Sequence, residues 1–177
     1  MPATTTLRSP RSIVLFPAPV LRRRAAEVAA VDQEIRDLVE DMFRVMKEED
    51  GAGLAAPQVG ESLRIFVVAA RPDDQEPARA YLNPVIEAMQ GDLVPWNEGC
   101  LSLPGIRGDI RRPPAVTLRW TELDGTTQVR TDDAMLARIW QHELDHLDGV
   151  LIVDRMTPVD RLRARKPLKE LKESHPG

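Results

Sequence analysis

The chain has 177 residues, of which 42% are hydrophobic and 29% are charged, and these values are typical of a single globular domain with its own core. Its formal net charge of -4 provides no overall attraction to nucleic acid or to an acidic membrane surface. No stretch approaches the ~20 apolar residues that cross a bilayer. We therefore expect a protein that binds neither membranes nor specific DNA, and its single cysteine fits a reducing cytoplasm.

The first predicted elements are a helix, a glycine-rich loop and a strand. Asp32 is a suitable N-cap for a helix over roughly Gln33–Glu49, whose apolar positions recur at helical spacing. The glycines of Gly51–Gly60 (GAGLAAPQVG) stop this helix and open a loop. Arg64–Ala70 is predicted to be a buried strand, and Arg71–Pro77 an exposed turn.

The middle of the chain is predicted to be mainly antiparallel strands. Tyr81–Ala88 is a candidate strand, and the proline-rich stretch 104–114 is expected to be extended or irregular. Ala115–Glu122 alternates as a strand does, and Asp124-Gly125 predicts a hairpin into Thr126–Arg130. Strands first and a long helix late indicate an α+β fold, with antiparallel β-sheets around a central helix.

That central helix is predicted over Met135–Leu147. Thr131 is a candidate cap, Asp132 and Asp133 are favourable in the first turn, and Gly149 ends the helix. Apolar residues on one face of the helix indicate that it packs inward.

The chain ends are predicted to be less regular. Val150–Val153 is a candidate final strand, and residues 1–12 are expected to form a flexible tail. Residues 160–177 form a basic segment, in which we favour a solvated helix over a binding patch and expect Pro167 to interrupt any helix.

The segment His142-Glu143-Leu144-Asp145-His146 contains two of the three histidines of the chain. Positions i and i+4 lie on one face of a helix, so His142 and His146 can hold one metal ion. Glu143 is then placed to move protons for a metal-bound water. The alternative is a chance pair of solvated histidines, which the apolar face of this helix disfavours.

Catalytic metal sites commonly have three protein ligands, and Cys100 is the best candidate for the third. It is the only cysteine, so no intrachain disulfide can form, and glycine and proline flank it in Glu98–Gly105 (EGCLSLPG). A lone cysteine can equally be a small buried hydrophobe. Gln58, in the glycine-rich loop, could stabilise an oxyanion, whereas a tight turn explains the glycines but not this side chain.

Three segments together resemble the signature motifs of the peptide deformylase family: Gly51–Gly60, Glu98–Gly105 and Gln141–Gly149 (QHELDHLDG). They occur in the family's order, and the similarity extends from about Ile13 to Pro158. The resemblance implies an α+β fold with three antiparallel sheets around a central metal-binding helix. Trp140 is bulkier than expected for the family, and we expect it to alter packing behind the site.

The resemblance also implies the roles of the site residues. The metal ligands would be Cys100, His142 and His146, and the metal one divalent ion, iron(II) in the native protein, with nickel, cobalt or zinc as replacements. The general acid/base would be Glu143. The oxyanion hole would be formed by Gln58 and the backbone N–H of Leu101, and the residues beside the substrate would be Gly53 and Arg107.

The implied activity is hydrolysis of the N-formyl group of formylmethionine on new polypeptides, with release of formate. A metal-bound water would lose a proton to Glu143 and attack the formyl carbon, and Glu143 would return the proton to the leaving amine. We expect a single catalytic domain over residues 1–177. The walls of its methionine pocket would be Met135, Ile139 and the methylene stem of Arg138, which precede His142 on adjacent helix faces.

Two alternatives remain at this point. A zincin endopeptidase would take its third ligand downstream of His146, and a structural metal module would need a second cysteine, which the chain lacks. The downstream candidates are Asp154, Asp160, Glu170 and His175. The expected partners are formylmethionyl nascent peptides, with a weaker hypothesis of ribosomal RNA bound by Arg161, Arg163, Arg165, Lys166, Lys169 and Lys172.

Overall fold

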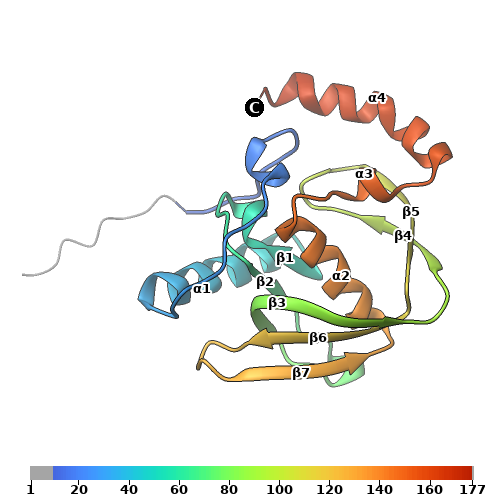
Figure 1. Ribbon diagram of the computed structural model, residues 1–177. Helices are drawn as coiled ribbons and strands as arrows, with labels where there is room; N and C mark the ends of the chain where they lie inside the picture. The colour runs from blue at the N-terminus through green and yellow to red at the C-terminus, as the bar shows by residue number, and fades with distance from the viewer. Residues whose placement is uncertain (1–9, 177) are drawn as a thin grey trace, which may run out of the picture.

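The computed structural model describes residues 10–176 and has an α+β architecture (Figure 1). Helix α2 (Met135–Leu147) lies in the middle of the molecule, with strands on more than one side of it. The predicted arrangement of antiparallel sheets around this helix is therefore confirmed. Within the described residues the named strands form two sheets, not the three that the resemblance implied.

The larger sheet has five strands, and each neighbouring pair is antiparallel. Its strands, in order across the sheet, are β1 (Gly53–Ala55), β2 (Ile65–Val68), β3 (Arg79–Gln90), β6 (Ala115–Thr121) and β7 (Thr127–Asp132). Strand β2 is buried along its whole length, as expected for a strand covered on both faces. The segment predicted to be a loop after the first helix thus includes the edge strand β1.

The smaller sheet is a hairpin of β4 (Val94–Gly99) and β5 (Arg107–Arg112), paired from Val94↔Arg112 to Gly99↔Arg107. Strand β4 has no clear signal in the sequence, because most of its side chains are exposed and its only buried residue is Glu98. The hairpin is important for the site because its strand β4 leads directly into Cys100.

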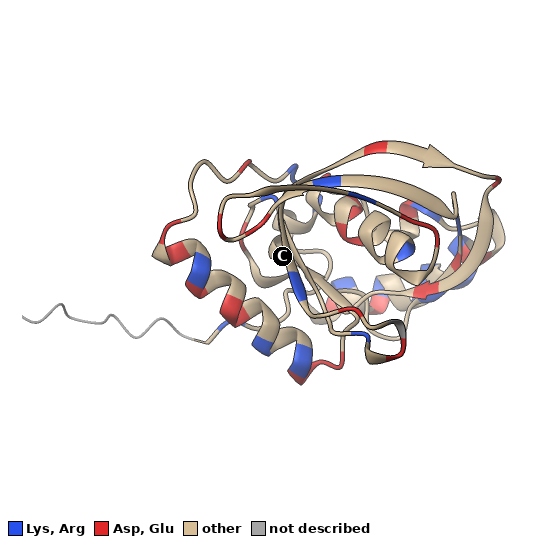
Figure 2. Ribbon diagram, turned by 90° about the horizontal axis from the view of Figure 1, so that it is seen from below, with Lys and Arg blue, Asp and Glu red and all other residues tan. Residues whose placement is uncertain are grey.

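Helix α1 (Gln33–Glu48) confirms the predicted first helix and its cap. A carboxylate oxygen of Asp32 accepts a hydrogen bond from the Ile35 N–H at 3.0 Å. The inward face of α1 packs in a core cluster with β1 and β2. Charged residues of both signs are spread along the length of this helix (Figure 2).

Helix α2 begins later than Thr131, the cap that we predicted. Thr131 lies in strand β7, and the helix starts after Ala134, whose side chain makes no capping bond. The carboxylate of Asp132 accepts from the N–H groups of Ala134 at 3.0 Å and Ala137 at 3.2 Å. Asp132 therefore supplies the cap, because a carboxylate at the end of a strand can reach the exposed N–H groups of the following helix.

Two further predictions near the C-terminus are wrong. The predicted strand over Val150–Val153 is replaced by a short helix, α3 (Ile152–Arg155), in which the Asp154 carboxylate accepts from the Leu151 N–H at 2.8 Å. Pro167 does not interrupt the last helix, α4 (Pro158–Ser174).

Helix α4 continues past Pro167 because turns on both sides of the proline are anchored. Ala164 is buried in the third core cluster, and Leu168 and Leu171 pack against that cluster. This packing offsets the hydrogen bond that proline cannot donate.

Trp140 fills the space behind α2. Its side chain is 0% exposed, and its ring lies 6.0 Å from Tyr81 and 6.1 Å from Trp120, measured between centroids. Tyr81 in turn stacks on Phe66 at 4.7 Å. The bulky residue therefore joins an aromatic core on the sheet side of α2.

The expected flexible tail, residues 1–12, lies mostly outside the described residues. Of its described part, the Arg11 side chain pairs with Glu61 and lies 3.6 Å from Asp41. Among residues 10–176, no helix combines the length and the apolar character needed to cross a membrane.

Candidate active site

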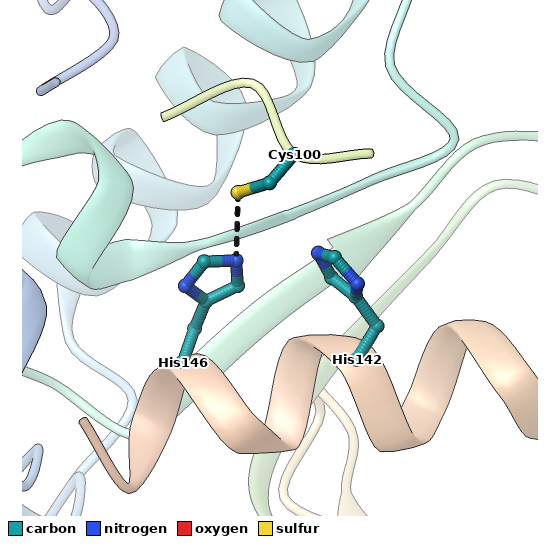
Figure 3. Close-up of side chains that lie close together, drawn as sticks. All are labelled: Cys100, His142 and His146. Carbon is teal, nitrogen blue, oxygen red and sulfur yellow. Dashed lines mark hydrogen bonds between the residues drawn. The ribbon is translucent and has the colours of Figure 1, made fainter. Parts of the chain in front are cut away.

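Three metal-ligating side chains meet where strand β4 ends beside helix α2. The ligand atoms of Cys100, His142 and His146 all lie within 4.8 Å of one another, and Cys100 Sγ is 3.3 Å from His146 Nε2 (Figure 3). Both histidines project from the same face of α2, as their i, i+4 spacing predicts. The structure thus brings together three residues that the sequence analysis grouped.

His142 is held in one orientation by Glu98. Its Nδ1 lies 3.0 Å from a carboxylate oxygen of Glu98, which leaves Nε2 facing the other two ligand atoms. Burial lowers the pKa of His142, but hydrogen bonds to Cys100 and Glu98 outweigh it and hold the pKa well above its ordinary value. A bound cation would act in the opposite direction.

His146 is the more buried of the two histidines, with 2% of its surface exposed. Burial is the main reason that its pKa lies well below the ordinary value, with the charge of His142 as a second cause. The imidazole is therefore neutral, which is the protonation state that binds metal.

These donors fit a divalent first-row metal ion. Bonds of about 2.0–2.3 Å from one ion to nitrogen and sulfur require ligand atoms only a few ångströms apart, and the three atoms here are that close. Imidazole and thiolate are ligands that such ions prefer. Three protein ligands also leave a coordination position for a small molecule.

Glu143 faces this cluster from within α2 and is 4% exposed. Its Oε2 atom is buried without a hydrogen-bond partner among the described residues. Burial raises the pKa of Glu143 to about 7, above the range of an ordinary carboxyl group. A carboxyl group with such a pKa can both accept and donate a proton near neutral pH.

Gly53 makes room for this carboxylate. A Cβ atom at position 53 would lie 2.6 Å from Glu143 Oε1, which is closer than nonbonded atoms approach. A glycine at position 53 is therefore needed for the close packing of β1 against Glu143. This is in addition to the substrate contact that the resemblance implies for Gly53.

Gln58 points its amide nitrogen toward the cluster. Its Oε1 accepts a hydrogen bond from the Ala55 N–H at 2.9 Å, which fixes the orientation of the amide. Its Nε2 consequently lies 3.6 Å from Cys100 Sγ and 3.3 Å from Ser102 Oγ. The side chain is 2% exposed, so this donor is rigid and close to the thiol.

A cavity of about 520 Å³ opens beside these residues. Its wall includes every predicted site residue except His146, which reaches the cluster through its contact with the Cys100 thiol. The predicted residues in the wall are Gly53, Gln58, Cys100, Leu101, Arg107, Met135, Arg138, Ile139, His142 and Glu143.

The two arginines of the wall are held by the hairpin. Arg107 donates to the Asn97 side chain at 2.8 Å and to the Asn97 carbonyl at 2.9 Å. Its guanidinium lies over Gly99, where a Cβ would be 2.6 Å from Nη1. Arg138 donates to Glu98 at 2.8 Å and to the Val94 carbonyl at 2.7 Å, so only its stem is available as a pocket wall.

Sequence reasoning missed several residues of the site. Glu98 and Arg112 form a buried ion pair beside His142, with Arg112 Nε 2.8 Å from Glu98 Oε1. Trp96, on β4, and Asp50, after α1, line the cavity. Among Glu98, Arg112, Trp96 and Asp50, only Glu98 had a signal in the sequence, which was its position within the second motif. The ion pair of Arg112 and the place of Trp96 in the cavity wall depend on how the β4–β5 hairpin folds.

The alternative third ligands are all engaged elsewhere. Asp154 pairs with Arg22, Asp160 accepts from the Asp109 N–H, and Glu170 lies 3.8 Å from Lys166. His175 follows α4 at the exposed end of the chain. Within residues 10–176, Cys100, His142 and His146 are the only group with metal-ligand geometry.

Comparison with known proteins agrees with this geometry. The sequence profile of the family described as polypeptide deformylase matches residues 10–162. A protein of Dictyoglomus turgidum named peptide deformylase is 43% identical over 148 residues, which cover 84% of this chain and 94% of that protein.

Solved structures are similar over almost the whole chain. The Plasmodium falciparum peptide deformylase in complex with an inhibitor has a TM-score of 0.84 and 39% identity, and covers 91% of this chain and 99% of its own. A peptide deformylase from Legionella pneumophila has a TM-score of 0.84 and 36% identity, covering 94% and 97%.

Proposed function

The chain belongs to the peptide deformylase family, and we propose that the site around Cys100, His142 and His146 removes the formyl group from the N-terminal methionine of new polypeptides. The zincin alternative is set aside, because the relatives are deformylases and the downstream candidate ligands lie away from the cluster. The observation that best supports the proposal is the Glu143 carboxylate, which is buried without a partner for Oε2 beside three metal-ligating side chains.

We propose that Cys100, His142 and His146 are the metal ligands. We propose iron(II) as the native ion, with nickel, cobalt or zinc as replacements. The bound ion supplies Lewis acidity toward water and toward the formyl oxygen. Cys100 contributes a soft thiolate, which suits iron(II) and zinc, while the histidines contribute neutral imidazole nitrogen.

Glu143 moves the proton in this proposal. Its carboxylate accepts a proton from the attacking water and then donates it to the amine that leaves as the C–N bond breaks. The products are formate and a peptide with a free N-terminal methionine. Its buried position supports this role, because a pKa of about 7 leaves both protonation states accessible near neutral pH.

Gln58 and the backbone N–H of Leu101 stabilise the oxyanion that develops on the formyl oxygen. The amide of Gln58 is preorganised for this role, because its oxygen is held by Ala55 and its NH₂ group faces the cluster. Leu101 directly follows Cys100 and lines the same cavity.

The methionine side chain would occupy the apolar part of the cavity. Met135 and Ile139 and the stem of Arg138 form one wall, all from the first two turns of α2. Gly53 on β1 and Arg107 on β5 would contact the peptide on either side. Because this substrate is made at the ribosome, we place the protein in the cytoplasm.

We also propose that basic residues of α4 contact ribosomal RNA phosphates. In support, the side chains of Arg163, Lys166 and Lys169 are at least 76% exposed. Phosphate binding by such residues would weaken steeply as salt is raised.

The test of the main proposal is formate release from a formyl-Met peptide, compared with acetate release from the same peptide carrying an acetyl group. A formyl carbon bears only hydrogen, so an added methyl group must enter a space enclosed by Gln58, β1 and Cys100. Overpacking by one carbon costs about 1–3 kcal/mol, or roughly 5–150-fold in rate, and the acetyl carbonyl is also less electrophilic.

We therefore expect kcat/KM to be at least about 100-fold lower for the acetyl peptide. The comparison is made anaerobically with one metal loading, and the metal content of the sample is measured alongside. Equal rates would show a broader deacylase, and absence of formate release from metal-loaded protein would reject the proposed function.

A further inference from the structure

A network of charged side chains, buried at its centre, runs from His142 on α2 to the partly exposed Arg155. It starts at His142, whose Nδ1 is 3.0 Å from Glu98 Oε2. Arg112 donates to both oxygens of Glu98, at 2.8 and 3.0 Å, and also to Asp145 at 2.8 Å. Asp145 accepts two further bonds from Arg155, each 2.6 Å long.

The centre of this network is buried. The side chains of Arg112 and Glu98 are 3% and 6% exposed, whereas Arg155 at the far end is 44% exposed and lies beside a second hollow of about 700 Å³. An ion pair that deep in a protein is costly to desolvate and contributes little net stability, so stability alone does not explain its presence.

The geometry of Arg112 is specific to arginine. Its planar guanidinium makes two parallel bonds to Glu98 and, with Nη1, a third bond to Asp145. Asp145 lies on α2, one residue before His146 and three after His142. The same side chain therefore joins β4, β5 and the helix that carries both histidines.

We propose that Arg112 is a positioning residue that acts through Glu98 to fix the orientation of His142. Its two bonds to Glu98, at 2.8 and 3.0 Å, hold the plane of that carboxylate in one orientation, with Oε2 toward His142. Nδ1 of His142 is thereby kept as the donor to Glu98, and Nε2 remains free to bind the metal.

Asp145 and Arg155 complete the arrangement from the other side. Asp145 holds the Nη1 end of Arg112, and Arg155 neutralises the second carboxylate oxygen. Arg138 also donates to Glu98 at 2.8 Å, but it is tied to the Ile110 and Val94 carbonyls as well and does not reach Asp145. Arg112 is thus the link between Glu98 and α2.

The inference rests on the metal ligands assigned above, and its test uses metal affinity instead of catalysis. Cobalt(II) is bound to the full-length protein in competition with a chelator, and the visible spectrum of the bound ion reports its coordination geometry. We expect Arg112→Met to weaken cobalt binding by about 10–100-fold and to alter the spectrum.

Arg112→Lys keeps the charge but cannot make both bonds to Glu98, so we expect a smaller loss, about 3–10-fold. This variant also keeps the proposal testable if Arg112→Met does not fold. Arg155→Gln, at the exposed end of this network of charges, is expected to change the affinity for cobalt by less than about 3-fold.

The matched control is Arg64→Met. Arg64 is also buried and donates to the end of α2, at Asp148 and the Leu147 carbonyl, but it does not contact Glu98. Both substitutions should lower thermal stability, whereas only Arg112→Met should weaken cobalt binding. Equal losses of cobalt affinity in the two variants would show a general loss of structure and overturn the proposal.

A double-variant cycle tests whether Arg112 acts through Glu98. In protein that already carries Glu98→Gln, adding Arg112→Met should weaken cobalt binding by less than about 3-fold further. The reason is that the carboxylate through which Arg112 is proposed to act has already been removed. The inference would be rejected if the loss of cobalt affinity in the double variant equalled the product of the losses in the two single variants. It would also be rejected if Arg112→Met and Arg112→Lys both bound cobalt with unchanged affinity. If instead the protein binds cobalt as expected but releases no formate, the proposed function fails while the positioning role stands.

Discussion

Helices α2 and α4 both carry polar and charged side chains, but these are largely buried in α2 and largely exposed in α4. In α2 the polar side chains of Gln141, Glu143 and His146 are at most 5% exposed. In α4 only Ala164 is buried, and charged side chains such as Lys166 and Lys169 are at least 76% exposed. A buried polar atom without a partner is costly, so Glu143 Oε2 and His146 Nδ1, which have none among the described residues, indicate a function, while the exposed charges on α4 need no such explanation.

The two helices also differ in what a substitution can disturb. The polar side chains on the inner face of α2 contact segments distant in the sequence, for example His142 with Glu98 on β4 and His146 with Cys100. The ion pairs Lys166–Glu170 and Lys169–Glu173 lie within α4 itself. Substitutions on α2 should therefore change chemistry, and those on α4 should leave it intact.

The largest effect is expected from His146→Ala, which removes one of three proposed ligands. We expect stoichiometric metal to be lost, together with formate release, because a site of two ligands holds a divalent ion far less tightly. The matched control is His175→Ala, since His175 is the remaining histidine and is exposed after α4. Retention of stoichiometric metal in His146→Ala would remove this residue from the ligand set.

Glu143→Gln should separate proton transfer from metal binding. The amide keeps the shape of the carboxylate but cannot accept and return a proton, so we expect metal retention with kcat lower by about 10²–10⁴-fold. Metal analysis and formate release on the same sample provide the measurement. Near-normal turnover would mean that another group moves the proton.

Gly53→Ala should have a smaller effect through the same carboxylate. Its Cβ would lie 2.6 Å from Glu143 Oε1, and a displacement of about 1 Å in an active site can lower the rate by roughly 10²-fold. We expect kcat to fall while metal content is unchanged.

The comparison for Gly53→Ala is Gly99→Ala, whose Cβ would lie 2.6 Å from Nη1 and 3.3 Å from Cζ of the Arg107 side chain and would not meet Glu143. Because Arg107 is proposed to contact the peptide, we expect this variant to raise KM more than it lowers kcat. Equal kcat losses in the two glycine variants would show that Gly53 has no special relation to Glu143.

Local sequence patterns predicted the elements whose signals are contained within one segment. Helix α1 was predicted from its cap at Asp32 and its apolar spacing, and the histidine pair of α2 from its i, i+4 separation. The three motifs then allowed Cys100, Gln58 and Glu143 to be grouped, although they come from separate parts of the chain. The structure brings all three beside one cavity.

The features that were missed depend on contacts between distant segments. Strand β4 is mostly exposed, and its buried residue, Glu98, is charged, so neither apolar alternation nor hydropathy indicated a strand. The partners of Glu98 are 14 residues away at Arg112 and 44 away at His142. No local pattern encodes such a network, because each charge is tolerated only once the others are in place.

The smallest effect is expected on α4, from the double substitution Lys166→Gln and Lys169→Gln. Each lysine makes one exposed i, i+4 pair 3.8 Å long, so the thermal midpoint should fall by only about 1–2 °C. Formate release and metal content should stay unchanged, since neither residue lines the cavity.

The same double variant tests the proposed ribosome contact without truncating α4, whose Leu168 and Leu171 pack against the third core cluster. If exposed lysines bind RNA phosphates, co-sedimentation with ribosomes at low salt should weaken, and the salt dependence of the remaining binding should become less steep. Lys47→Gln, on α1, removes an exposed lysine far from α4 in the sequence and serves as the control. Unchanged co-sedimentation in the double variant would argue against lysine-mediated binding by α4. If the double variant released formate more slowly, substitutions on the exposed surface of α4 would affect the site on α2. The two helices would then not be independent, contrary to what their opposite patterns of burial indicate.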